Sequence, residues 1–309
     1  MNRPSICVVG SLNVDLVVTL DRFHLPGETV RGVNYHTFPG GKGGNQAIAA
    51  ARLGADVRMI GCLGEDANAA LYRAVLDGAR VDARYVFAEP DAPTGVALIE
   101  VDASGENRIA VVRGANDALT PDRVTDARHA IEAGGYLLAQ LEVPLESVLR
   151  AARLAREVGA RVIFDPAPAP VTPVPDELLS LCDYLTPNEH ELRALTGLPA
   201  EGEAQAIDAC TILIRRGAKA VVNKRGAKGA LLVTADGARA IPAFSVNAVD
   251  TTAAGDTFNA AFAVRLSMKY PAEEAIRFAN AAAALSTTAM GAQSAMPDFV
   301  GALALMEAM

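Results

Sequence analysis

Long apolar runs, blocks of basic residues and closely paired cysteines are all missing from this chain of 309 residues. Because no apolar run is long enough to span a bilayer and the first residues do not form a signal peptide, we expect no membrane partner and a cytoplasmic location. The net charge of −8 and the scattered Lys and Arg argue against nucleic acid as a partner. The four cysteines have no CxxC spacing, which excludes a zinc or disulfide framework and predicts reduced thiols in the core. They are Cys7, Cys62, Cys182 and Cys210.

Strand-like and helix-like segments alternate along most of the chain. We expect apolar strands at residues 6–9, 57–62, 136–141, 162–164, 184–185, 220–223 and 240–249. We expect helices at residues 45–53, 67–76, 145–158, 177–181, 189–195, 204–216 and 258–268. This alternation predicts an α/β fold with a doubly wound, three-layer, mostly parallel sheet, and the strands lack the polar alternation of a half-exposed sheet. With 51% hydrophobic residues, a sizeable core and a single domain over residues 1–309 are expected.

Two regions interrupt this alternation. Residues 12–38 contain no helix signal, and residues 94–113 predict a hairpin whose turn lies at 102–105. Together they predict a small antiparallel sheet outside the main layer. A lid over a ligand site and an ordinary edge hairpin both fit this pattern.

The segment 251–258, with the sequence TTAAGDTF, is the most informative stretch of the chain. Its small residues lie between an expected strand and an expected helix, where free backbone N–H groups and the helix dipole favour an anion. A carboxylate, Asp256, is out of place in a site that only holds phosphate. It fits a site where a hydroxyl loses its proton as a phosphoryl group arrives. We therefore interpret Asp256 as a general base.

A second glycine-rich segment, GGKGGN, occupies residues 40–45. Its spacing matches neither a P-loop nor a dinucleotide-binding fingerprint. Glycines allow close backbone approach to a ligand, and the donors of Lys42 and Asn45 suit hydroxyls or phosphates. A flexible turn is the alternative interpretation.

Polar residues also follow several of the expected strands, at the edge where α/β sheets bind their ligands. Asn13 and Asp15 could bracket sugar hydroxyls or form a turn, and Glu142 could accept sugar hydroxyls or be a surface acid. Asp165 follows another strand. These residues are candidates for a common site.

Two more segments have the chemistry of a nucleotide site. Asn188 and Glu191 lie one helical turn apart, which suits water-mediated Mg²⁺ and phosphate contact and also a capping box. The basic, glycine-containing segment 224–229 suits a nucleotide phosphate or a charged hairpin turn.

Taken together, these segments resemble the ribokinase-like sugar kinases, the PfkB family. The resemblance covers essentially the whole chain and is most specific at 40–47 and 249–258, with further similarity at 10–15, 26–29, 140–142 and 186–189. It implies an ATP-dependent kinase that phosphorylates the primary 5-hydroxyl of D-ribose and uses Mg²⁺ and K⁺. It also implies that segments 12–38 and 94–113 form a β lid that mediates a homodimer.

The resemblance also assigns roles to residues of this chain. Asp256 is the implied base, with the N–H groups of Ala253, Ala254, Gly255 and Asp256 as the anion hole. The implied sugar ligands are Asn13, Asp15, Gly41, Lys42, Asn45, Glu142 and Asp256. The implied ATP site comprises Asn188, Lys224, Gly226, Lys228, Gly229, Gly255 and Asn280, with Glu191 holding Mg²⁺ through water. The implied monovalent-cation site comprises Asp250, Thr252, Ser286, Ala289 and Gly291.

The chain departs from the family pattern at a few positions, and other functions remain open. Lys224 stands where Thr is common, and Ser294-Ala295 replaces a usual Pro-Ser pair. A nucleoside kinase and a fructokinase are the alternatives within the family, and Phe38 as the only aromatic residue near the sugar loop favours a free sugar. A non-catalytic sugar or nucleotide sensor would not need Asp256. A dinucleotide oxidoreductase is disfavoured by the missing fingerprint.

Overall fold

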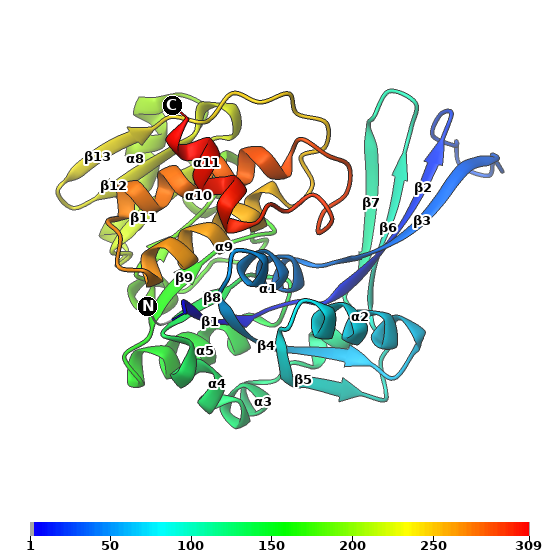
Figure 1. Ribbon diagram of the computed structural model, residues 1–309, viewed down its shortest axis with the longest axis horizontal. Coiled ribbons are helices and arrows are strands. Elements are labelled where there is room, and N and C mark those ends of the chain that lie inside the picture. The colour runs from blue at the N-terminus through cyan, green and yellow to red at the C-terminus, as the bar shows by residue number, and fades with distance from the viewer. Residues whose placement is uncertain (1–2, 309) are drawn as a thin grey trace.

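The computed structural model describes residues 3–308, so the first two residues, on which the signal-peptide expectation partly rests, and residue 309 lie outside it. Within this range the chain forms a nine-stranded main sheet covered by helices on both faces, and a separate four-stranded sheet (Figure 1). In spatial order the main sheet contains β13 (Gly237–Ile241), β12 (Ala230–Thr234), β11 (Ala220–Lys224), β10 (Tyr184–Leu185), β9 (Arg161–Phe164), β8 (Tyr136–Ala139), β1 (Ser5–Val9), β4 (Asp56–Gly64) and β5 (Asp82–Glu89). All pairings are parallel except those of β12 with β11 and β13.

The central strands are apolar on both faces because both faces are covered. In β1, Ile6 and Val8 pack into one core cluster, and Cys7 and Val9 pack into the other. Successive side chains of a strand point to opposite faces, so a strand buried on both sides has no polar positions. This confirms the predicted doubly wound α/β architecture.

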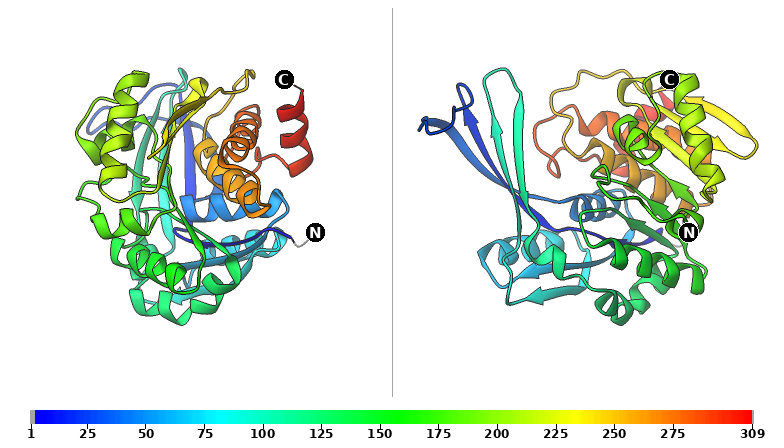
Figure 2. Two further views of the ribbon diagram at one scale, coloured as in Figure 1. Left: turned by 90° about the vertical axis from the view of Figure 1, so that its left-hand side faces the viewer. Right: turned by 180° about the vertical axis from the view of Figure 1, so that it is seen from behind.

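The helices form two layers, one on each side of the main sheet (Figure 2). One layer contains α1 (Lys42–Arg52), α2 (Ala67–Gly78), α9 (Ala254–Ser267), α10 (Ala272–Ser286) and α11 (Phe299–Glu307). The other contains α3 (Pro121–Asp126), α4 (Arg128–Gly134), α5 (Leu145–Glu157), α6 (Asp176–Leu181), α7 (Glu189–Thr196) and α8 (Glu203–Arg215). Two short 3-10 turns, η1 (Gly114–Ala118) and η2 (Gly226–Lys228), lie in loops.

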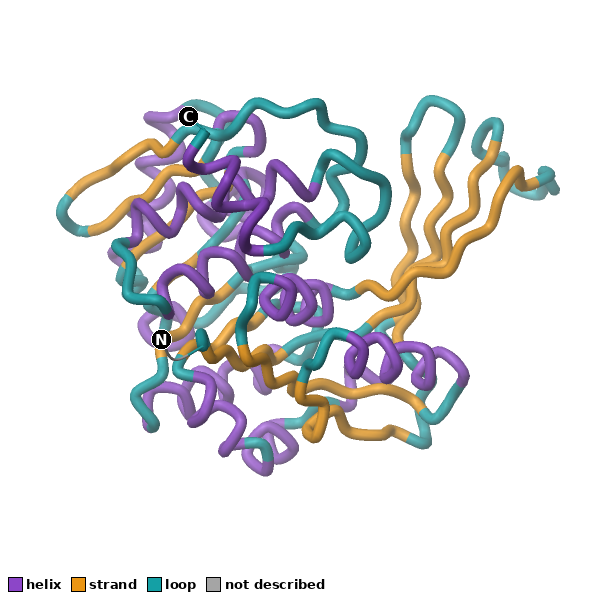
Figure 3. Tube along the Cα trace, in the orientation of Figure 1, coloured by secondary structure: helices purple, strands orange, loops and turns teal. Residues whose placement is uncertain are grey.

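The small sheet projects from the body as an arm of orange strands in Figure 3. Its order is β3 (Gly32–Gly40), β2 (Asn13–Leu20), β6 (Gly95–Val101) and β7 (Asn107–Val112). The expected sheet is confirmed, but β2 pairs with β6 in parallel instead of antiparallel. The reason is topological: β2 follows β1 and β6 follows β5, and β1 and β5 run in the same direction through the main sheet.

One expected strand is wrong. Of residues 240–249 only the first two belong to a strand, β13, and residues 242–249 form a loop. Pro242 has no N–H to donate to a strand ladder, which explains why pairing ends there. The apolar residues after it instead line the cavity described below.

All four cysteines are buried as free thiols, as their spacing predicted. No helix within residues 3–308 has both the length and the apolar character needed to cross a membrane. The cytoplasmic location stays a prediction.

Candidate active site

A cavity of about 690 Å³ opens at the carboxyl ends of β9, β10 and β11. This is the edge of a parallel sheet where α/β proteins bind ligands, and the volume suits a small cofactor. The predicted site residues on its wall are Lys42, Asp165, Asn188, Glu191, Lys224, Gly226, Gly229, Ala253, Ala254, Gly255, Asp256 and Asn280. The fold therefore brings segments far apart in the sequence to one place.

The first turn of α9 forms one end of this cavity. Ala253 precedes the helix in the left-handed conformation, with φ of 60°, an unusual state for a residue with a Cβ that marks local strain. The N–H of Ala254 bonds to the carbonyl of Thr251 at 3.2 Å. The N–H groups of Gly255 and Asp256 have no such partner among the described residues, as expected for the first turn of a helix. These two donors face the place predicted for an anion.

The carboxylate of Asp256 is buried and held by two amides from α1. Asn45 Nδ2 donates to its Oδ2, and Gln46 Nε2 donates to its Oδ1, both at 3.1 Å. Burial raises the pKa of Asp256 to about 6, with Asp165 adding to the rise, while Lys42 and the two amides oppose it. A carboxylate with a pKa near neutrality and a fixed orientation suits a general base.

Gln46 is a functional candidate that sequence reasoning missed. Its Nε2 also donates to Asp165 Oδ2 at 3.1 Å, and its Oε1 accepts from Gln140 Nε2 at 2.6 Å. Lys224 Nζ donates to the other oxygen of Asp165 at 2.8 Å. Gln46 thus separates two buried carboxylates that would otherwise repel. The only signal in the sequence was its place directly after the GGKGGN segment.

Lys42 supplies positive charge inside this group of acids. Burial opposes its charged form, but Asp256, Glu142 and Asp165, together with Glu191, more than offset that effect and raise the pKa of Lys42 above its usual range. It therefore stays protonated beside the cavity. A cation in that position suits a phosphate.

The predicted sugar residues lie next to Asp256, on the side of the small sheet. Glu142 accepts from Ser11 Oγ and, at 3.0 Å, from the backbone N–H of Lys42. Asn13 Oδ1 accepts from Asn116 Nδ2 at 2.7 Å. Burial, followed by the charges of Glu142 and Asp256, raises the pKa of Asp15 to about 7.

The glycines of segment 40–45 allow close packing of the backbone, and their approach to a ligand stays a prediction. A Cβ on Gly43 would lie 2.6 Å from the backbone of Ser11, and one on Gly41, whose φ is 81°, would lie 2.7 Å from the backbone nitrogen of Asn13. These glycines therefore let α1 approach the chain leaving β1. Their close contact is with protein, which fixes Asn13 and Asn45 relative to each other.

Asn188 and Glu191 form the capping box of α7, as one of the two interpretations predicted. Asn188 Oδ1 accepts from the N–H of Glu191 at 2.8 Å, and Glu191 Oε2 accepts from the N–H of Asn188 at 2.7 Å. Burial raises the pKa of Glu191, with Lys224 opposing. Within residues 3–308 no group of three or more His, Cys, Asp or Glu side chains could hold a metal directly. The contact of Glu191 with Mg²⁺ through water stays a prediction.

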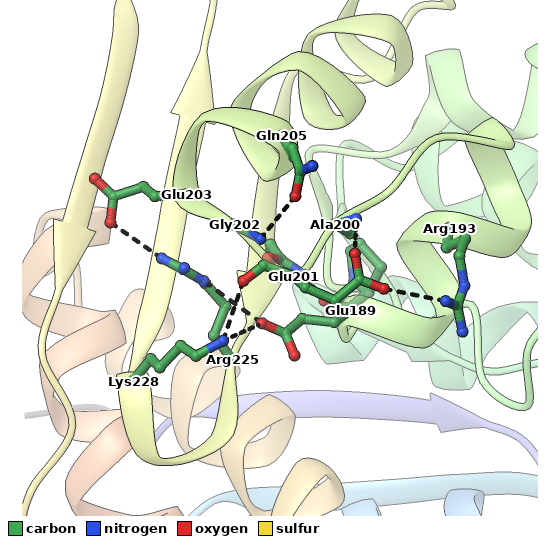
Figure 4. A network of polar contacts seen from close by, with 11 residues as sticks. Glu189, Arg193, Ala200, Glu201, Gly202, Glu203, Gln205, Arg225 and Lys228 are labelled. Carbon is green, nitrogen blue, oxygen red and sulfur yellow. Dashed lines mark hydrogen bonds and ion pairs between the residues drawn. The ribbon is translucent and has the colours of Figure 1, made fainter.

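The 225–229 segment is fixed by a charged network on the outside of the cavity (Figure 4). Lys228 Nζ lies 3.0 Å from Glu189 Oε1, and Arg225 lies 3.1 Å from a carboxylate oxygen of Glu203. Lys228 is thus directed at Glu189, while Gly226 and Gly229 line the cavity. The network ties this loop to α7 and α8.

Asn280 holds another part of the cavity wall. Its Nδ2 donates to the carbonyls of Ile241 and Pro242 at 3.2 and 3.0 Å. It therefore anchors the loop that replaces the expected strand.

The predicted cation residues come from the loop before α9 and from the end of α10 and the loop after it, and the bond between Gly291 and Asp250 joins the two loops. Asp250 Oδ2 accepts from the N–H of Gly291 at 2.8 Å, and Asp250 Oδ1 accepts from the N–H and the hydroxyl of Thr252. Ser286 Oγ instead donates to the carbonyl of Ala283 at 2.8 Å, and Ala289 lies in the turn before Gly291. The monovalent-cation site stays a prediction.

Comparisons with known proteins agree over nearly the whole chain. The pfkB family carbohydrate kinase model matches residues 3–298. The ribokinase of Haemophilus influenzae is 41% identical over 305 residues, covering 99% of each chain, and that of Bacillus subtilis is 43% identical over 295 residues, covering 95% of this chain and 96% of that protein. The solved structure of Arabidopsis thaliana ribokinase complexed with ribose and ATP has a TM-score of 0.93 and 37% identity, covering 99% of both chains.

These matches extend over both the main sheet and the small sheet, and the catalytic geometry is consistent with them. The chain therefore belongs to the pfkB family of carbohydrate kinases.

Proposed function

We propose that this protein is a ribokinase, an ATP-dependent kinase that transfers a phosphoryl group to the 5-hydroxyl of D-ribose. The observation that carries the proposal is Asp256: a buried carboxylate, anchored on both oxygens, in the first turn of a helix whose free N–H groups face a cavity with two lysines. Relatives at 41% and 43% identity are ribokinases, and the Arabidopsis thaliana relative is complexed with ribose and ATP.

In the proposed reaction, Asp256 takes the proton of the sugar hydroxyl as that oxygen attacks phosphorus. A base with a pKa of about 6 is mostly ionised at neutral pH and still accepts a proton. Asn45 and Gln46 keep the carboxylate oriented toward the hydroxyl. Most of the remaining catalysis comes from positioning and charge stabilisation, as in other phosphoryl transfers.

ATP supplies the phosphoryl group, and residues around the cavity would hold it. The N–H groups of Gly255 and Asp256 face the developing negative charge, and Lys42 and Lys224 provide cations on two sides. A Cβ on Gly255 would lie 3.7 Å from Lys224 Nζ, so this ammonium is close to the anion site. Gly226, Gly229 and Asn280 also line the cavity and suit the nucleoside part.

We assign the ions from their donor sets. Mg²⁺ would neutralise phosphate charge when bound, held through water by Glu191 with Asn188 beside it. K⁺ would lie in the loop of Asp250, Thr252 and Gly291, where it would stabilise the turn that leads into α9.

We assign the small sheet as a lid of the single kinase domain and as its dimer interface. Val33, Tyr35 and Leu98 are large apolar side chains on one face of this sheet, each about half exposed or more. Pairing of two such sheets would cover these side chains. Closure over the sugar would also exclude water from the phosphoryl group.

The test is an ADP-release assay over ribose, deoxyribose, fructose and several nucleosides, each with and without K⁺. Ribose is expected to give the highest kcat/KM, and a clearly better nucleoside or fructose would overturn the substrate assignment. Replacing Asp256 with Asn should lower kcat by at least about 100-fold, the low end for a general base. ATP binding should persist in that variant, and near-normal turnover would rule out Asp256 as the base.

A further inference from the structure

Gln293 is a buried polar residue to which neither the family resemblance nor the proposed mechanism gives a role. It is 7% exposed and lies in the loop between α10 and α11. Its Nε2 donates to Asn45 Oδ1 at 3.1 Å and to the hydroxyl oxygen of Tyr72 at 3.3 Å. Asn45 is the residue that donates to the carboxylate of Asp256.

Asp256, Asn45, Gln293 and Tyr72 form a series of hydrogen bonds. The groups at its two ends fix which group donates in each bond. At one end, the ionised carboxylate of Asp256 only accepts, so Asn45 must present its Nδ2 there and its Oδ1 toward Gln293. At the other end, the hydroxyl hydrogen of Tyr72 is donated to the carbonyl of Gly40, so its oxygen accepts. Gln293 lies between two acceptors and must present its NH₂ group to both.

From this geometry we infer that Gln293 is a positioning residue, which locks the side-chain amide of Asn45 in the orientation that donates to the catalytic carboxylate. This role rests on the proposed function only in that Asp256 is the catalytic base. The hydrogen-bond chain itself is independent of the substrate.

The loop that carries Gln293 is itself tied to two parts of the site. Gly291 donates to Asp250 at 2.8 Å, next to the turn that leads into α9. Arg52 of α1 donates to the carbonyls of Ser294 and Met296 at 3.2 and 2.7 Å. A shift of this loop would therefore move Gln293 and change the contact of Asn45 with Asp256. The amide of Gln293 therefore connects the loop after α10 to Asp256 through Asn45.

Without Gln293, Oδ1 of Asn45 loses its donor, and only the bond to Asp256 still holds the Asn45 amide. A less firmly held amide donates a weaker bond to the carboxylate, and that bond favours the ionised form of Asp256. We expect kcat to fall and its acid limb to move to higher pH. The charged groups around Asp256 from every neighbouring element remain in place: Asp15, Lys42, Glu142, Asp165, Glu191 and Lys224.

The experiment compares Gln293→Met, which is similar in size but cannot donate, with the wild type. The kcat at saturating ribose and ATP should fall about 10-fold, the loss of one hydrogen bond to a polar network around a charge. The KM for ATP should stay within about 2-fold, because Gln293 is remote from the nucleotide wall of the cavity. Ser294→Ala, in the same loop, removes only a bond to the carbonyl of Met290 and should leave kcat unchanged.

A double-substitution cycle separates positioning from a general effect on the fold. In an Asn45→Ala background the amide to be oriented is gone, so Gln293→Met should change kcat less than about 2-fold. An equal loss in both backgrounds would show that Gln293 acts elsewhere and would overturn the inference. So would an unchanged kcat and pH profile in Gln293→Met.

A second variant covers the case in which Gln293→Met folds poorly. Tyr72→Phe keeps the bond from Gln293 to Asn45 but removes the hydroxyl that fixes the direction of the Gln293 amide. It should lower kcat by a smaller factor than Gln293→Met and shift the acid limb of the kcat profile to higher pH. An unshifted acid limb in Tyr72→Phe would contradict the inferred role of Gln293. If the wild type phosphorylates another sugar and not ribose, the proposed substrate is wrong. The role of Gln293 can then be tested in the same way with that sugar.

Discussion

Replacing Gln46 with Met should weaken the catalytic base in a pH-dependent way. Gln46 donates from one nitrogen to Asp256 Oδ1 and Asp165 Oδ2, both at 3.1 Å, and is itself fully buried. Met has nearly the same size and removes both donated bonds without leaving a large cavity. The two carboxylates would then face each other without an amide between them.

The expected magnitude follows from the lost hydrogen bond. A bond to a charged group contributes ~1.5 kcal/mol or more, so its loss should raise the pKa of Asp256 by roughly 1. Burial already holds this pKa at about 6. At pH 6 the ionised fraction would fall about 5-fold, and at pH 9 it would hardly change. A less firmly oriented carboxylate should cost roughly another 10-fold at every pH.

The assay is kcat at saturating ribose and ATP between pH 5.5 and 9, for wild type and Gln46→Met. The loss in kcat should be about 10-fold at pH 9 and grow to about 50-fold at pH 6, because a raised pKa keeps the base protonated to higher pH. Gln205→Met, on the exposed start of α8, is the matched control and should have the wild-type profile. A loss that is the same at every pH, or larger at high pH than at low pH, would contradict this role of Gln46.

Three further predictions concern stability, nucleotide binding and assembly. Because burial, Glu142 and Asp256 raise the pKa of Asp15 to about 7, the folded state binds a proton more tightly than the unfolded state, and stability falls as pH rises from about 4 to about 7. Asp15→Asn should therefore raise the free energy of unfolding at pH 8 by on the order of 2 kcal/mol, and not at pH 4, in urea titrations; an equal effect at both pH values would disagree. Arg225→Ala should loosen the nucleotide loop and raise the KM for ATP several-fold with kcat retained, and a loss of kcat alone would contradict this role. Leu98→Glu should place a charge on the apolar face of the small sheet and convert a dimer to a monomer in sedimentation experiments, whereas an unchanged dimer would place the interface elsewhere.

The parts of the fold that follow from local rules were predicted well. The β1 strand, α5 and the hairpin of β6 and β7 occur where apolar patterns and turn residues placed them. The expected strand at 240–249 failed because Pro242 ends the ladder, and the sequence pattern alone gave too much weight to the apolar residues beyond it. The parallel pairing of β2 with β6 could not be predicted locally, because it depends on the directions of β1 and β5 in another sheet.

In the site, too, some residues could be predicted from local sequence and others could not. The places of Asp256 and Lys42 on one cavity, and the capping box of Asn188 and Glu191, were predictable because each lies in a short segment with an unusual composition or spacing. Gln46 was not, because its importance comes from Asp165, which is 119 positions away in the sequence. A buried glutamine in a helix has no local signature of what it will meet.

The sequence by itself determined the kind of chemistry: a carboxylate at a helix start among small residues, a glycine-rich segment before another helix, and an alternation that builds a parallel sheet. These depend on neighbouring residues, and local sequence is enough to specify them. Only the tertiary structure decided how the base is held. Asn45 and Gln46 reach Asp256 across 211 and 210 positions of sequence, and Gln293 reaches Asn45 across 248. Hydrogen-bond direction and pKa depend on which groups meet in the folded core, and the packing of α1, α9 and the loop after α10 sets that.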